Sequence, residues 1–187
     1  MRKVGREELL DWQTYDEGRD SLRRSAMAAK ARRRLHLGES LTLLFENPET
    51  IRYQIQEIMR AERIVKEADI RHELETYNEL LGGPGEIGAT LLIEIPDEEE
   101  RRRKLREWRD LPQYVRAVLD DGEQVAARVD ERQRDDEKAS SVQFLKFPVG
   151  GRIPRAFVVD HRAYRAEVNL SADQREALRE DLEGEAS

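Results

Sequence analysis

The sequence has 187 residues, with 33 Lys and Arg against 40 Asp and Glu, and it contains no Cys. The missing thiols exclude disulfides, thiol nucleophiles, iron–sulfur ligation by this chain and thiolate zinc sites. No apolar run approaches the ~20 residues of a membrane-spanning helix and no signal-peptide core follows the first residue, so we expect a cytoplasmic protein outside the membrane.

The first predicted elements are two helices and then two short strands. They are expected over residues 7–12, 16–31, 35–37 and 41–45. The strands flank Gly38-Glu39-Ser40, and a three-residue loop would pair Leu37 with Leu41 and Leu35 with Leu43. That register gathers the apolar side chains on one face, so we prefer it to a two-residue loop.

A central helix pair is predicted over residues 49–81. Asn47 is a good N-cap and Pro48 suits the first turn, so the first of the two helices should begin here and run to about residue 66. Asp69 is expected to cap the second helix, in which Tyr77 belongs to an apolar stripe with helical spacing.

The second half of the chain is richer in strands. A central strand is predicted at 89–95 and a helix at 97–109. Asp121-Gly122 is typical of a tight hairpin turn, which would pair Val118 with Val125. The remaining predicted elements are strands at 142–149, 156–160 and 164–168, and a helix that begins with the capping box Ser171–Gln174 and ends near Gly184.

These elements favour one α+β domain over residues 1–187, with N-terminal helices and a central helix pair packed on a largely antiparallel sheet. Residues 130–141 are polar and lack apolar periodicity, so we expect an exposed, mobile connection there.

Glu62 is the most informative polar residue of the helix pair. On a helical wheel it falls among Ile51, Ile55 and Met59, and Gln54 falls inside the same arc. A carboxylate at such a position must be paired, hydrogen-bonded or protonated. Two interpretations stay open: an internal ion pair, and a functional carboxylate that accepts a proton or binds a metal.

Basic residues gather in two places. Arg52, Arg60 and Arg63 form a strip on the other side of the same helix, which would be either a solvated face or an anion site. Residues 19–36 carry a second concentration, but no aromatic residues interleave with it and the chain is acidic overall, so nucleic-acid binding is not favoured. The three His residues lack metal-ligand spacing, and the sequence predicts no metal site and no cofactor.

Several blocks of the sequence resemble the bacterial family DUF3501, a domain of unknown function. The blocks are Leu41–Asn47, Tyr53–Glu57, Arg60, Glu62–Ile64, Glu75–Asn78 and Ala89–Glu94. The resemblance implies no activity. In the family that the sequence resembles, the genes look like neighbours of genes for rubrerythrin-like and iron–sulfur oxidoreductases. This gene neighbourhood implies a link to redox or peroxide stress.

The first functional hypothesis is therefore a non-catalytic accessory protein that binds redox proteins, with homo-oligomerisation also open. Its working surface would lie on the helix pair 49–81. The candidate residues are Gln54, Glu57, Arg60, Glu62, Arg63, Tyr77 and Asn78. The alternatives are a metal-binding or enzymatic protein that uses buried carboxylates of the same helix pair, and a nucleic-acid-binding protein that uses residues 19–36.

Overall fold

The computed structural model describes residues 1–130 and 137–184. Its helices are α1 (Trp12–Ala31), α2 (Pro48–Glu62), α3 (Glu67–Asn78), α4 (Glu98–Glu107) and α5 (Ala172–Glu183), with 3-10 turns η1 (Arg6–Glu8) and η2 (Leu111–Tyr114). Its strands are β1 (Arg34–His36), β2 (Leu41–Phe45), β3 (Ile87–Ile93), β4 (Val115–Val118), β5 (Gln124–Ala126), β6 (Arg128–Val129), β7 (Val142–Phe147), β8 (Ala156–His161) and β9 (Tyr164–Asn169).

The strands form two antiparallel sheets, which confirms the α+β class. One sheet has the order β1-β2-β3-β7-β6 and the other the order β5-β4-β8-β9. The sheets face each other, because the ring of Phe157 on β8 lies 5.0 Å from the ring of Phe45 on β2 and 5.1 Å from that of Phe147 on β7. The main core is therefore a layer of aliphatic and aromatic side chains between two sheets.

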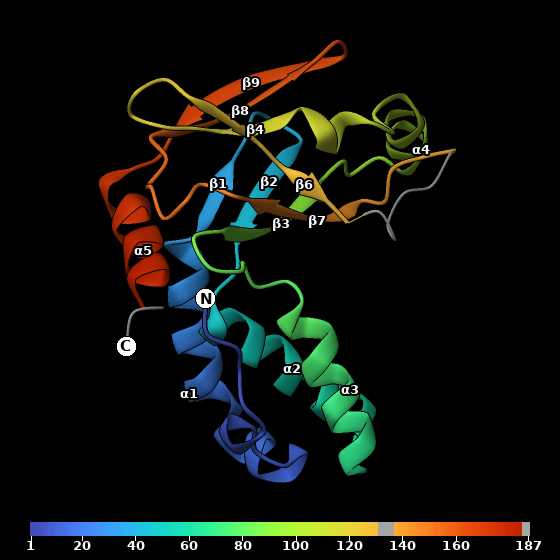
Figure 1. The fold of residues 1–187 in the computed structure, drawn as a ribbon. Helices are drawn as coiled ribbons and strands as arrows, with labels where there is room; N and C mark the ends of the chain where they lie inside the picture. Colours follow the sequence, from blue (N-terminus) through green and yellow to red (C-terminus); the bar gives the residue numbers. More distant parts are fainter. Residues whose placement is uncertain (131–136, 185–187) are drawn as a thin grey trace.

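The helices α1, α2 and α3 lie together and project beyond one end of the sheets (Figure 1). We call residues 1–31 and 48–81 the helical lobe. Its own apolar cluster contains Ile51, Ile55 and Met59 of α2, Ile70 of α3 and residues near the N-terminus, and no strand residue. The apolar faces of these helices are thus buried against one another. The number of domains in the chain stays a prediction.

The first hairpin has the predicted register. Leu35 pairs with Leu43, and the Leu37 amide donates to the Leu41 carbonyl over 2.8 Å. Asn47 also caps α2 as expected, because its side chain accepts from the Thr50 amide. The prediction that Asp69 caps α3 is wrong, since α3 begins three residues earlier, after Lys66.

The second predicted hairpin is shifted by one residue. Val118 pairs with Gln124 instead of Val125, and the Leu119 amide donates to the Glu123 carbonyl, which leaves a three-residue loop. Gly122 has a φ of +87°, the left-handed conformation that a three-residue hairpin loop needs. The shift turns Leu119, which a two-residue turn would expose, into a buried core residue.

Residues 131–136 of the predicted connection 130–141 lie outside the described residues. On its C-terminal side the prediction of exposure fails at Ala139, which is buried and donates its amide to the Leu105 carbonyl. The strands that follow belong to different sheets, since β7 joins one sheet and β8 the other. The final capping box is confirmed by reciprocal hydrogen bonds between Ser171 and Gln174.

Candidate functional site

Glu62, the centre of the sequence-based hypothesis, is exposed to solvent. The helix ends at this residue, because Arg63 adopts a left-handed conformation with a φ of 52°, and the buried face of α2 ends one turn earlier at Met59. A helical wheel gives the direction of a side chain but not how far along the helix the neighbouring elements reach. The predicted buried carboxylate at this position is therefore wrong.

Glu57 instead joins α2 to α1. The Arg19 guanidinium donates two hydrogen bonds to its carboxylate, at 2.8 and 2.9 Å, and the Tyr15 hydroxyl donates a third at 2.7 Å. These hydrogen bonds, that of Arg19 above all, lower the pKa of Glu57. The carboxylate is thus held as an anion within an interhelical ion pair.

Two residues of the predicted basic strip, Arg60 and Arg63, contact side chains of α1. The Arg60 guanidinium lies 3.4 Å from the Asp16 carboxylate and 3.8 Å from that of Glu57. The Arg63 guanidinium lies 5.7 Å from the centre of the Trp12 ring, within reach of a cation–π contact. Arg52, one turn before Gln56, makes no hydrogen bond, ion pair or ring contact with any described residue.

Asn78 and Gln56 hold the N-terminal segment against the helix pair. The Asn78 side-chain amide accepts from the Val4 amide at 2.8 Å and donates to the Val4 carbonyl at 3.0 Å. Gln56 forms the same reciprocal pair with the backbone of Leu10, at 2.6 and 3.1 Å. Both side chains therefore satisfy backbone groups of a segment that lacks regular secondary structure around them.

Sequence reasoning missed the carboxylate that is truly buried, Glu46. It is 1% exposed, and the hydroxyls of Thr50 and Thr90 donate to it at 2.5 and 2.6 Å. The Gln54 amide lies 3.5 Å from both carboxylate oxygens, and Lys30 is near enough to act on the charge. Burial raises the pKa of Glu46, and these polar neighbours only partly oppose the rise.

The sequence did contain a signal for Glu46. The residue directly follows β2, which is buried along its whole length, and directly precedes the N-cap of α2. An acid between a buried strand and a helix start can lie inside the molecule, where free backbone amides and the helix dipole favour negative charge. The helical wheel selected Glu62, at the C-terminal end of α2, whereas the buried acid Glu46 lies just before the N-terminus of the same helix.

Tyr77 lines a groove of about 560 Å³ between α3 and the β6–β7 edge. We call it the α3–β7 groove. Its lining residues are Thr76, Tyr77, Glu79, Leu80, Arg128, Val129, Asp130, Phe144, Leu145 and Lys146. Burial raises the pKa of the Tyr77 phenol, with Glu73 and Glu62 acting in the same direction, so the hydroxyl keeps its proton.

The seven candidate residues thus occupy different places instead of one site. Glu57 and Arg60 face α1, Gln54 approaches the buried Glu46, and Asn78 holds the N-terminal segment. Of the seven, Tyr77 lines the α3–β7 groove, which is of ligand size.

Part of the charge of the basic segment 19–36 is neutralised by neighbouring elements. Arg32 pairs with Asp173 and Glu180, and Arg33 forms a buried bidentate ion pair with Asp181, in which both distances are 2.8 Å. Both of these pairs tie the end of α1 to α5. These ion pairs remove Arg32 and Arg33 from the charge available to a nucleic acid, while Arg23, Arg24 and Arg34 stay exposed.

The described ranges 1–130 and 137–184 contain no group of three or more His, Asp or Glu side chains placed to hold a metal ion. In those ranges no helix is long and apolar enough to cross a membrane. His161 is buried, with Nε2 3.2 Å from the Asp110 carboxylate and Nδ1 accepting from the Ala163 amide. It helps to hold the β8–β9 turn against η2.

The fold defines a class of protein with two facing antiparallel sheets, a projecting helical lobe, and a groove between α3 of that lobe and the β6–β7 edge. The chain belongs to the family described as "Protein of unknown function (DUF3501)", whose model matches residues 3–182. It is also similar to a crystal structure of a novel protein of unknown function from Burkholderia pseudomallei, at 33% identity and a TM-score of 0.89. That match covers 97% of this chain and 100% of the other, and no curated protein matches.

Proposed function

We propose that this protein is a non-catalytic accessory protein that binds a redox protein through the α3–β7 groove. The observation that carries the proposal is the position of Tyr77 in that groove. Its ring is half-buried, and its hydroxyl has no hydrogen bond to any described residue. Tyrosines that combine apolar area with a free hydroxyl are common anchors in protein interfaces.

The groove has the size and chemistry to accept a peptide segment. Its volume of about 560 Å³ lies within the roughly 300–1,000 Å³ of sites that bury a ligand. Leu80, Val129, Leu145 and the Phe144 ring contribute most of an apolar lining. A partner would therefore gain by burying aliphatic or aromatic side chains there.

The groove is lined by charges of both signs, with Glu79 and Asp130 beside Arg128 and Lys146. The Arg128 guanidinium is already paired with Glu86 at 2.7 Å. The Lys146 ammonium lines the groove and makes no ion pair with a described residue. We therefore expect the bound segment to place a carboxylate near Lys146, beside its apolar side chains.

The redox link rests on the resemblance to proteins encoded near rubrerythrin-like and iron–sulfur oxidoreductases. It names the class of partner, an iron-containing oxidoreductase, and the setting, redox or peroxide stress in a bacterial cytoplasm. Under this proposal the protein positions or protects its partner and does not itself turn over a substrate.

The test is a binding experiment with variants of the groove. The tagged chain is expressed in its host under peroxide stress, and the co-purified proteins are identified and then titrated in pure form. Lys146→Glu and Tyr77→Ala should each weaken binding of an identified oxidoreductase by roughly tenfold or more, while Arg23→Glu on exposed α1 should not. Equal binding by all variants, or capture of no oxidoreductase, would contradict the proposal.

The non-catalytic part has its own readout. The purified chain is mixed with hydrogen peroxide and the loss of peroxide is followed with and without the identified partner. We expect no consumption by the chain alone. Sustained turnover by the chain alone would make it an enzyme and would overturn this part of the proposal without affecting the interface.

A further inference from the structure

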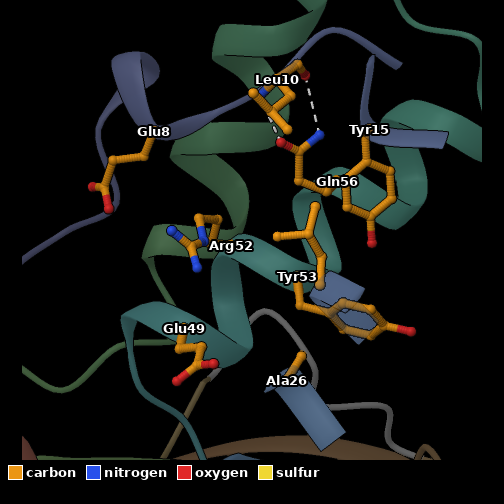
Figure 2. Close-up of a pocket in the computed structure, with 9 residues that line it drawn as sticks. Glu8, Leu10, Tyr15, Ala26, Glu49, Arg52, Tyr53 and Gln56 are labelled. Atoms are coloured by element: carbon orange, nitrogen blue, oxygen red, sulfur yellow. Dashed lines mark hydrogen bonds between the residues drawn. The ribbon is translucent and has the colours of Figure 1, made fainter. Parts of the chain in front are cut away.

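A second cavity lies within the helical lobe, between the N-terminal segment, α1 and α2 (Figure 2). Its volume is about 180 Å³, and it shares no residue with the α3–β7 groove. The lining residues are Glu8, Leu10, Tyr15, Leu22, Ala26, Glu49, Arg52, Tyr53 and Gln56. At about 30 Å³ for each liquid water, the space equals that of roughly six waters, which suits a small ligand.

One side of this cavity is apolar. Ala26 of α1 and the rings of Tyr15 and Tyr53 form the wall, with Leu10 above them (Figure 2). Leu22 of α1 also lines the cavity. Ala26 and Tyr15 are 2% and 1% exposed, so this wall is rigid and already packed. A short aliphatic chain would bury apolar surface here without moving the helices.

Most polar groups of the cavity are already satisfied. The Gln56 amide is used by the Leu10 backbone, and the Tyr15 hydroxyl donates to Glu57. Glu8 accepts two hydrogen bonds from Arg2, at 2.7 and 3.0 Å, and one from the Gly5 amide. None of these groups needs a ligand.

Two charged side chains keep unused capacity. Glu49 accepts one hydrogen bond, from the Ser25 hydroxyl at 2.7 Å, although a carboxylate can accept about four. Arg52 has five N–H donors and no hydrogen bond or ion pair to a described residue. The two lie three residues apart on α2, where opposite charges commonly pair, yet they do not pair with each other.

We propose that this cavity binds a small aliphatic α-amino acid as a zwitterion. The Arg52 guanidinium receives the ligand carboxylate, for which its planar fork is suited. The Glu49 carboxylate receives the ammonium group, and the aliphatic side chain lies against Leu22 and Ala26. The proposal does not depend on the partner bound in the α3–β7 groove.

Charge balance selects the zwitterion over simpler ligands. A plain carboxylic acid would satisfy Arg52 but would add a negative charge beside Glu8 and Glu49. The hydrogen bond from Arg2 above all lowers the pKa of Glu8, and the Arg52 charge makes a small contribution in the same direction. A plain amine would leave Arg52 unpaired and bring a cation close to it. A ligand that carries an ammonium and a carboxylate group on the same carbon satisfies both side chains.

The test is calorimetric titration of the full chain with L-valine and with its two half-ligands. Isovalerate lacks the ammonium group, and isobutylamine lacks the carboxylate. We expect saturable binding of valine with one site, and at least tenfold weaker binding of either half-ligand. Equal binding of isovalerate would identify a simple anion site, and no saturable heat at about 10 mM valine would remove the site altogether; either result overturns the proposal.

Three variants make the assignment specific. Arg52→Gln and Glu49→Gln should each weaken valine binding by at least tenfold. Arg52 loses only its charge interaction with Glu8, and the amide oxygen introduced by Glu49→Gln can still accept from Ser25, so both variants should melt near the wild-type temperature. Arg23→Gln, on the exposed side of α1, is the matched control and should bind valine normally. Unchanged valine binding in Arg52→Gln contradicts the proposed site.

Discussion

The pair of facing sheets and the helical lobe are each stabilised by a different kind of interaction. Between the sheets, Phe45, Phe147 and Phe157 meet in one layer of apolar side chains. The helical lobe has a smaller apolar cluster and relies on polar links, in which Gln56 and Asn78 satisfy backbone groups. Polar residues on its helices are therefore mostly structural, although their sequence pattern suggested a functional site.

The largest expected effect comes from the layer between the sheets. Phe157→Ala removes a fully buried ring that contacts two other phenylalanines, and it should lower the free energy of unfolding by about 3–5 kcal/mol. Urea denaturation followed by fluorescence and by circular dichroism measures this loss. A change below about 1 kcal/mol would show that the sheets do not share a core.

In the helical lobe, Asn78→Ala tests a polar link. The variant leaves the Val4 amide and carbonyl without their partner, and it should lower the free energy of unfolding by about 1–3 kcal/mol. Hydrogen exchange should show faster exchange at Val4 and unchanged exchange at Leu91 in the sheet. Equal loss of protection at both positions would mean that the two regions unfold as one unit.

Glu57→Gln tests the ion pair between α1 and α2. We expect a loss of about 1–2 kcal/mol at neutral pH, since the pair is partly exposed. The pKa of Glu57 is lowered in the folded chain, so its contribution is present above the unfolded pKa and is lost as pH falls through the folded value. The difference between wild type and variant should therefore shrink in acid, as measured by urea denaturation across pH.

Glu46→Gln should give the smallest change and the opposite dependence on pH. Burial raises the pKa of Glu46, so the folded chain holds the proton more tightly than the unfolded chain, whose ordinary pKa is 4.5. Its contribution is full below that value and is lost as pH rises through the folded pKa. Relative to wild type, the variant should gain stability as pH rises towards neutrality, as measured by urea denaturation. A gain in acid instead would mean that Glu46 is an ionised partner of Lys30.

Much of the local structure was predictable because short-range chemistry determines it. The register of the first hairpin follows from which loop length gathers apolar residues, and Asn47 and Ser171 cap helices through their own backbone neighbours. The shifted second hairpin shows the limit. Two turns were compatible with Asp121-Gly122, and the burial of Leu119 decided between them.

The candidate site was much less predictable. Periodicity placed Glu62 on the buried side of α2, but burial at a helix end depends on how far the packed neighbours extend. Glu46 became buried because β2 carries it inside, where Thr90 of β3 and Thr50 of α2 meet it. Arg52 stands out only in the tertiary structure, where the charged residues around it pair with residues of other elements.

The residues alone determined the α+β class of this protein, its acidic and cysteine-free chemistry, its family, the helix caps Asn47 and Ser171, and most of its strands. The tertiary structure decided that there are two sheets, that the helices form a separate lobe, and which carboxylate is buried. The reason is the range of the forces involved. Capping and hairpin register depend on neighbours a few residues away, whereas desolvation and charge pairing depend on which distant segments meet.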